Sequence, residues 1–210
     1  SITLISSEGG DIALGSSVGN FGITDASKLS NVVLSASETG NIDLGKLGST
    51  SSIEDLQNIS LASSGATISI GTISSKDVGT CTVSISSSGI VTLGELNFQN
   101  AGSMLTATGS GTLSPLVFSN EAYGTINLSD LVTTTSVDFS NADETVTIYG
   151  SSGVDTIVSG KGADIFIGNS GADVFVIENG KTGITLNTAD KIDDFVSGED
   201  KLKLGLAGDS

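Results

Sequence analysis

A strict nine-residue period runs through the last third of the chain and limits its fold more than any other feature. Residues 150–158 read GSSGVDTIV, residues 159–167 read SGKGADIFI and residues 168–176 read GNSGADVFV. Glycine, aspartate and a large apolar residue hold the same places in every copy, at Gly153, Gly162 and Gly171, at Asp155, Asp164 and Asp173, and at Ile157, Phe166 and Phe175. Such a period is typical of one small unit that stacks on itself, because each copy must send its apolar residue into a shared core.

Each copy divides into a turn and a strand. Glycine allows a tight turn that exposes backbone carbonyls, aspartate adds a carboxylate, and the last three residues form a strand with its apolar residue pointing inward. Calcium (Ca²⁺) takes six to eight oxygen ligands, and stacked turns offer carbonyls and carboxylates together. We therefore predict a calcium-binding segment with ligands from Gly150, Ser152, Gly153, Asp155, Gly160, Gly162, Asp164, Gly168, Ser170, Gly171 and Asp173.

Two copies are expected to make one coil, so residues 18 apart should stack. Asp155 and Asp173 then lie on one edge and should share an ion. Asp164 lies on the opposite edge, where its stacking neighbours are Val146 and Thr182, so this second site must take ligands from elsewhere. Glycine turns without any ion remain an alternative, although three stacked carboxylates without paired bases repel one another.

Upstream of the nonapeptides a looser unit recurs, made of a glycine turn, a short apolar strand and usually another glycine. The last apolar residues of these units are spaced 30, 26, 23 and 35 residues apart, at Leu14, Leu44, Ile70, Leu93 and Leu128. Further strands are expected at 31–35, 58–61 and 82–85. Such irregular spacing favours a solenoid with loops of variable length. A β-sandwich of hairpins is the alternative, and disorder fits the Ser, Thr and Gly content but not the recurrent β-branched strands.

The predicted fold is therefore all-β. An irregular, Ser/Thr/Gly-rich parallel β-solenoid (a β-helix) over residues 1–140 leads into a calcium-binding parallel β-roll with a closing segment over residues 141–210. The division rests on acidity, since residues 138–210 hold 13 of the 24 acids. The first residues are strand-like and lack an initiator Met, so we expect a fragment of a longer protein.

Composition excludes several classes of function. The chain has no Arg, no His and a net charge of −16, which disfavours nucleic-acid binding, anionic membranes, histidine-dependent catalysis and histidine zinc sites. No apolar run is long enough for membrane insertion. Cys81, the one cysteine, cannot form an internal disulfide. We interpret it as a small buried hydrophobe, with a reactive thiol as the alternative.

The nonapeptides resemble the G-G-x-G-x-D-x-U-x repeat of RTX calcium-binding proteins. Residues 188–204, TADKIDDFVSGEDKLKL, resemble the segment that closes the calcium β-roll in RTX exoproteins, including serralysin-type proteases. That resemblance implies that Asp190, with Asp193 as a second candidate, completes the site beside Asp164; a solvated acidic loop is the alternative. Residues 53–61, IEDLQNISL, together with 29–34, LSNVVL, resemble RTX-type bacterial surface-layer proteins.

These resemblances imply an extracellular or cell-surface structural protein that folds and assembles when calcium is present. Its expected partner is itself, in a lattice or array, with cell-surface polysaccharide as a further candidate. The alternative function is a calcium-stabilised adhesin, carbohydrate-binding or type I secretion module of a larger exoprotein. No enzymatic activity is expected, because only carboxylate chemistry is available and pairs such as Asp193 and Asp194 are better explained by calcium ligation or solvation.

Overall fold

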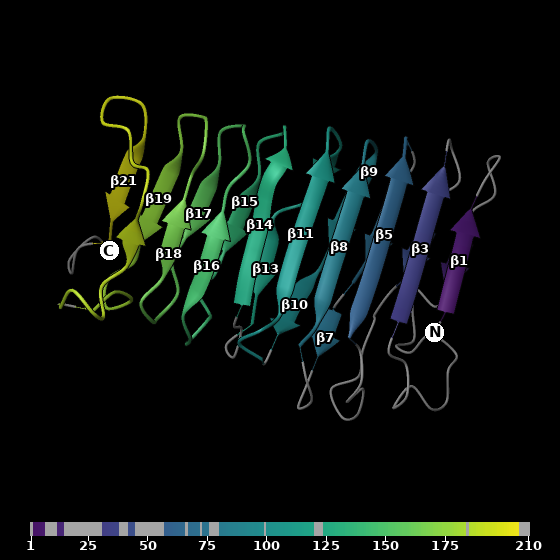
Figure 1. Cartoon of the computed structure of the whole chain (residues 1–210), viewed down its shortest axis with the longest axis horizontal. Helices are drawn as coiled ribbons and strands as arrows, with labels where there is room; N and C mark the ends of the chain where they lie inside the picture. The colour runs from purple at the N-terminus through teal and green to yellow at the C-terminus, as the bar shows by residue number, and fades with distance from the viewer. Residues whose placement is uncertain are drawn as a thin grey trace.

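The computed structural model describes residues 2–6, 12–14, 31–37, 42–44, 57–65, 67–71, 73–75, 80–98, 100–119, 124–183 and 185–205. All strand pairs in these ranges are parallel and assemble into three sheets wound around one interior (Figure 1). No helix in these ranges is long and apolar enough to cross a membrane. The described chain is thus a parallel β-solenoid, and a sandwich of antiparallel hairpins is excluded.

The largest sheet has nine strands, in the order β1-β3-β5-β8-β11-β14-β16-β18-β20. Their bounds are β1 Ile2–Ser6, β3 Asn31–Ser37, β5 Asn58–Ser64, β8 Thr82–Ser87, β11 Met104–Gly109, β14 Gly124–Leu131, β16 Val146–Tyr149, β18 Ile165–Ile167 and β20 Lys191–Ile192. These strands lie side by side along the whole length of the molecule in Figure 1, so consecutive coils add one strand each to this sheet.

A seven-stranded sheet forms the second side. It contains β7 Ile73–Ser75, β10 Glu95–Phe98, β13 Leu116–Phe118, β15 Ser136–Asp138, β17 Thr156–Val158, β19 Val174–Ile177 and β21 Lys201–Leu204. A five-stranded sheet forms the third side, with β2 Ile12–Leu14, β4 Ile42–Leu44, β6 Thr67–Ile70, β9 Ile90–Leu93 and β12 Thr112–Leu113.

The coil changes from three-sided to two-sided along the chain. The five-stranded sheet ends at β12, and its place is taken first by residues 132–134 and then by the glycine turn at 150–153. The Thr133 hydroxyl donates to the Gly111 carbonyl at 2.8 Å, and the Ser152 N–H donates to the Leu131 carbonyl at 3.0 Å. The offset between neighbouring strands of the nine-stranded sheet falls accordingly, from 27 residues between Val32 and Ile59 to 18 between residues 148 and 166.

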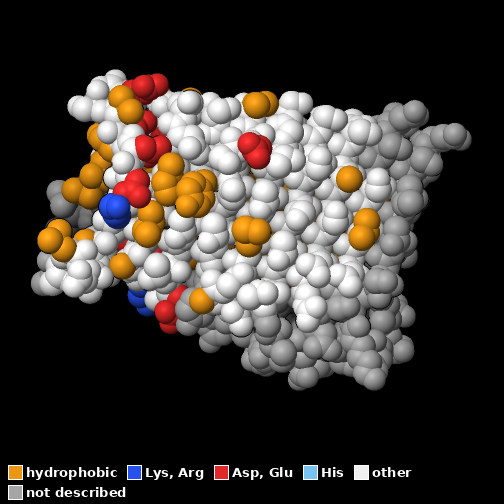
Figure 2. Space-filling view, in the orientation of Figure 1, with side chains coloured by type: hydrophobic (Ala, Val, Ile, Leu, Met, Phe, Trp, Pro, Cys, Tyr) orange, Lys and Arg blue, Asp and Glu red, His pale blue; other side chains and the backbone are white. Residues whose placement is uncertain are grey.

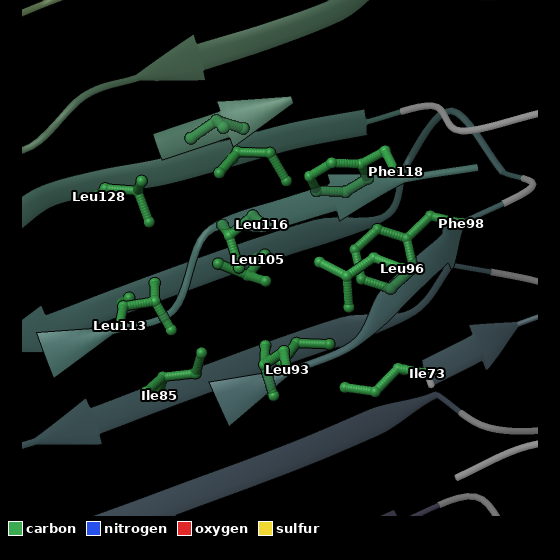
Figure 3. Close-up of a cluster of buried hydrophobic side chains, with 14 of the residues drawn as sticks. Ile73, Ile85, Leu93, Leu96, Phe98, Leu105, Leu113, Leu116, Phe118 and Leu128 are labelled. Atoms are coloured by element: carbon green, nitrogen blue, oxygen red, sulfur yellow. The ribbon is translucent and has the colours of Figure 1, made fainter. Parts of the chain in front are cut away.

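Period-two alternation builds the core. In strands such as β8 and β9 every second side chain is buried, while the residues between them face outward. Ile, Leu, Val and Phe from all three sheets meet in one continuous interior, seen in close-up in Figure 3. Phe118 stacks on Phe139 with ring centroids 4.2 Å apart, and Phe98 meets Phe118 edge to face at 6.0 Å. Cys81 is fully buried in this core, which confirms its interpretation as a small hydrophobe.

The predicted stacking of the upstream units is confirmed with one correction. Leu14, Leu44, Ile70 and Leu93 lie in successive strands of the five-stranded sheet at matching positions. Leu128 does not continue this row, because it belongs to the eight-residue strand β14 of the nine-stranded sheet. The strands predicted at 31–35, 58–61 and 82–85 are β3, β5 and β8. The proposed division at residue 140 remains a prediction; β14 pairs with β16 and β15 with β17 across it.

Replacing Phe118 with alanine should lower the free energy of unfolding by about 3–5 kcal/mol, because the ring is fully buried between two others and leaves a cavity. Chemical denaturation followed by circular dichroism measures the loss. Val117→Ala is the matched control, since Val117 lies in the same strand but is 38% exposed; its effect should stay within about 0.5 kcal/mol. Equal losses in the two variants would contradict the packing described here.

Candidate metal centre

The three nonapeptides stack with the predicted geometry. β17 and β19 pair in the seven-stranded sheet with Ile157 opposite Phe175, and β16 pairs with β18 in the nine-stranded sheet with Ile148 opposite Phe166. Both offsets are 18 residues, so two nonapeptides make one coil. Each aspartate directly precedes its strand. Asp155 and Asp173 therefore lie on one edge of the stack, and Asp164 lies on the opposite edge.

A row of aspartates, here called the first ladder, joins successive coils on the first edge. Asp155 Oδ1 accepts the Thr135 N–H at 2.9 Å, and Asp173 Oδ1 accepts the Asp155 N–H at 2.8 Å. Asp200 Oδ1 continues the row by accepting the Asp173 N–H at 3.0 Å. Asp155 and Asp173 are 0% and 1% exposed. Each carboxylate therefore lies inside the stack and connects its own turn to the preceding coil.

The opposite edge carries an equivalent second ladder. Asp164 Oδ1 accepts the Val146 N–H at 3.0 Å, and Asp190 Oδ1 accepts the Asp164 N–H at 3.0 Å. Asp164 is fully buried. The structure thus places Asp190 beside Asp164, where the resemblance to RTX closing segments put it.

Two details of the prediction for this edge are wrong. Thr182 does not stack on Asp164; it forms a bridge with Gly162, and its hydroxyl accepts the Asp190 N–H at 2.8 Å. The connection between β19 and β20 is eight residues longer than the nonapeptide period, so Asp190 reaches the predicted position 26 residues after Asp164 instead of 18. Asp193 follows β20 at the other end of the strand and pairs with Lys191 at 2.6 Å, away from Asp164.

The same carboxylates also close their own turns. The second oxygen of Asp164 accepts the N–H of Gly160, four residues earlier, at 3.2 Å. Asp155 Oδ2 accepts the Ser151 N–H at 2.5 Å, and the Ser151 hydroxyl donates to Oδ1 of the same residue at 2.7 Å. Ser151 was not among the predicted ligands. The two predicted serines, Ser152 and Ser170, have exposed side chains.

Glycine is required in these turns for two different reasons. Gly162 and Gly171 have φ of +120° and +131°, a region that side-chain-bearing residues rarely adopt. Gly150 is required by space, because a Cβ built there would lie 2.6 Å from the Gly168 carbonyl oxygen and 2.7 Å from Asp155 Oδ2. A carbonyl and a carboxylate therefore converge on one small space, and neither is a hydrogen-bond donor.

This arrangement fits a calcium ion. Asp190 Oδ2 is buried and has no hydrogen-bond partner among the described residues. The two ion pairs found in the described ranges lie outside the ladders and do not neutralise them. No three acidic, His or Cys side chains in those ranges surround one point, so an ion held here takes carboxylates in pairs together with glycine carbonyls. Such an all-oxygen, mixed ligand set is the kind that calcium prefers.

Burial raises the pKa of the ladder carboxylates. It raises the pKa of Asp164 to about 7 from an ordinary 3.8, and the charge of Asp190 adds to the effect. It raises the pKa of Asp173 to about 6, and the charges of Asp155, Asp200 and Asp194 act in the same direction. Burial also raises the pKa values of Asp155 and Asp190. Hydrogen bonds from backbone N–H groups lower these pKa values but do not cancel the effect of burial. No positively charged side chain in the described ranges contributes to the shifts, so the ladders lack a compensating positive charge.

Asp200 was missed in the sequence although its signal was present. Gly198, Asp200 and Leu202 repeat the Gly-x-Asp-x-apolar spacing of the nonapeptides, and Gly198 has the positive φ of its counterparts, +95°. The ladder bond to Asp173 places Asp200 at the next position of the first edge. Only the unequal spacing, 27 residues instead of 18, concealed it.

Asp194 was not among the predicted ligands, and no periodic signal marks it. Its two oxygens accept the N–H groups of Gly168 and Asn169, each at 2.8 Å. Asp194 thereby closes the third glycine turn from outside, at the position where Asp173 would bind its own turn. Asn169 has a φ of 66° in this turn and donates from Nδ2 to the Gly150 carbonyl at 2.7 Å.

Residues 99–208, more than half of the chain, match the family described as Peptidase M10 serralysin C terminal. The chain belongs to this family. Serralysin C-terminal domains are RTX calcium-binding repeats folded as a parallel β-roll, and they occur in secreted proteins. The family match therefore confirms the nonapeptide interpretation and the β-roll. No curated protein and no solved structure matches the chain.

In this serralysin C-terminal domain the chain's own residues explain what the metal does. Asp155 and Asp173, with carbonyls of the glycine turns, would hold calcium on the first edge, and Asp164 with Asp190 would hold it on the second. Bound calcium supplies the positive charge that the buried carboxylates lack. The aspartates orient the turns by their bonds to N–H groups, and Gly162 and Gly171 allow the coils to approach closely.

Asp173→Asn should have opposite effects with and without calcium. The amide oxygen can still accept the Asp155 N–H, but the buried charge is gone, so in chelator at about pH 8 the variant should melt at a higher temperature than wild type. In calcium it should bind the ion at least about tenfold more weakly. Thermal melts and calcium titrations followed by circular dichroism measure both effects. Glu178→Gln, an exposed acid outside the ladders, is the control and should change neither.

Stability without calcium should fall as pH rises. The folded-state pKa values of about 6 for Asp173 and about 7 for Asp164 exceed the ordinary 3.8. Between pH 3.8 and the folded-state pKa values, the folded state therefore binds more protons than the unfolded state. The associated stability is complete below pH 3.8 and is lost as the pH rises through about 6 and about 7. Melting temperatures in chelator should decrease from about pH 5 to about pH 8, and Asp173→Asn should reduce the slope. A rise over this window would contradict the shifts.

Proposed function

We propose that this chain is an extracellular, non-enzymatic structural module. In this proposal its β-roll folds when calcium binds, and copies of the folded module associate into an array such as a bacterial surface layer. The chemistry is metal-dependent folding, in which the free energy of calcium binding becomes free energy of folding.

The observation that carries the proposal is the pair of buried aspartate ladders. Carboxylates that are 0–1% exposed, with raised pKa values and no paired base, oppose folding at neutral pH unless a cation joins them. Calcium-binding extracellular modules have dissociation constants of about 10⁻⁴–10⁻³ M. A roll built in this way would stay open at low calcium and close outside the cell.

The surface-layer part of the proposal has separate support. Residues 53–61 and 29–34 resemble segments of RTX-type surface-layer proteins; 53–56, 29 and 30 lie outside the described residues, and 58–61 form part of β5. The solenoid upstream of the roll also offers long parallel sheets, and a stiff rod of this kind suits a repeating assembly.

Absence of catalysis is also part of the proposal. The acids considered for hydrolytic chemistry are engaged, since Asp193 pairs with Lys191 and Asp194 binds two backbone N–H groups. The family match itself is to the C-terminal part of serralysin peptidases, named apart from the protease domain.

One observation favours a second candidate function. The matched family is a domain carried by secreted peptidases, which supports a secretion or binding module attached to a larger exoprotein. Such a module would fold with calcium and remain a monomer.

Calcium titration of chelated protein separates the two candidates. Circular dichroism should report folding, and light scattering should report large, chelator-reversible assemblies at millimolar calcium, with magnesium as the control ion. Folding without growth would support the secretion or binding module in place of the array. If neither folding nor size responds to calcium, both candidate functions are wrong.

A further inference from the structure

The outer face of the nine-stranded sheet is almost free of charge. In a chain in which 15% of residues are charged, Asp130 is the single charged residue in β1, β3, β5, β8, β11, β14, β16 and β18. The last strand, β20, adds Lys191, whose ammonium is paired with Asp193 at 2.6 Å. The largest sheet is therefore nearly neutral, although the chain has a net charge of −16.

The residues that do face outward are apolar or small and polar. Val33, Met104 and Tyr149 are 38–39% exposed on this face. Ile165 and Ile167 of β18 are half-buried, with Ile167 opposite Tyr149. Between them lie Ser, Thr and Asn side chains. Figure 2 shows this face as a broad uncharged surface with scattered hydrophobic side chains, while basic and most acidic groups gather toward the end that carries β18 to β21.

The seven-stranded sheet differs. Its outward positions carry Glu95 on β10, Asp138 on β15, and Lys201 and Lys203 on β21. Neutrality therefore does not follow from the solenoid fold. The five-stranded sheet is also nearly neutral, with Asp43 on β4 as the one charge in its strands, but those strands are two to four residues long and contain no Met or aromatic residue. An interface centre is typically depleted of charge and contains aromatic residues and methionine, as the nine-stranded sheet does.

The scarcity of charge on the nine-stranded sheet favours a second copy of this chain as its binding partner. Two copies of a strongly acidic chain repel each other wherever their carboxylates meet, and the nine-stranded sheet is the larger of the two sheets whose strands carry almost no charge. Flat sheets pack face to face at about 10 Å, with side chains interdigitating between them. If the nine-stranded sheets of two copies packed face to face, Met104 and Tyr149 of each copy would be removed from water.

We propose that two copies of this chain pack through the outer faces of their nine-stranded sheets, sheet against sheet. This inference rests on the proposed self-association and names the surface that performs it. The two-fold arrangement buries the same residues on both copies, as symmetric dimers do, and leaves the calcium-binding edges of the roll free.

A single added charge tests the surface. Ser84→Glu places a carboxylate at an exposed outward position of β8, in the middle of the face. Thr92→Glu is the matched control, because Thr92 is an exposed outward hydroxyl on β9, a strand with neighbours on both sides in the five-stranded sheet. Sedimentation velocity over a protein dilution series at saturating calcium should show association weakened at least tenfold by Ser84→Glu and unchanged by Thr92→Glu.

Removing a charge from the same face should have the opposite effect on association. Asp130→Asn should strengthen association, whereas Glu95→Gln, on the seven-stranded sheet, should not. Circular dichroism of every variant in calcium verifies folding, so a loss of association is not mistaken for unfolding.

The outcomes separate the two proposals. If wild type associates in calcium and Ser84→Glu associates equally well, this surface is wrong and the proposed self-association stands. If folded wild type stays monomeric at all concentrations, self-association itself is wrong, and the surface with it. Binding of a neutral polysaccharide to monomers, lost in Ser84→Glu, would replace the second copy by a glycan and overturn the inference.

Discussion

The hydrogen bond between a buried aspartate carboxylate and a backbone N–H of the preceding coil is the interaction on which the roll depends. Strands in a parallel solenoid are joined by regular main-chain hydrogen bonds, whereas main-chain bonds between the turns are scattered and form no continuous ladder. Asp155, Asp164 and Asp173 provide one, because each accepts an N–H from the coil before it. The same burial that makes these bonds strong leaves negative charge without a partner, and this explains why the turns need a cation.

The need for such turns follows from the narrowing of the coil. In the three-sided part, strands such as β5 and β14 are seven and eight residues long, and apolar side chains from three sheets fill the interior. In the roll, β17 and β18 are three residues long and bury one large side chain each. A coil with so small a core gains less from apolar burial, so its turns must contribute more of the stability.

Charge is distributed unevenly between the edges of the roll and the outer face of the nine-stranded sheet. Among the described residues, most acids lie in the roll and its closing segment, where calcium would neutralise those of the ladders, while the nine-stranded sheet carries one charge on its strands before β20. A chain with acids spread evenly would gain solubility but would keep its copies apart. In the proposed assembly, acids kept on the edges would allow metal-dependent folding and close approach of a flat face in the same molecule.

The sequence by itself determined the repeating unit. Gly, Asp and the apolar residue of each nonapeptide keep their roles because a nine-residue period, doubled to 18, fixes the position of each residue in the coil through local geometry alone. How the repeats end depends on contacts between distant coils. The longer connection between β19 and β20 changes the phase, so Asp190 and Asp200 reach the ladders at 26 and 27 residues, whereas Asp193 pairs with Lys191. Loop length is free to vary wherever the chain returns to the same strand register, and for that reason spacing in the sequence could not place these residues.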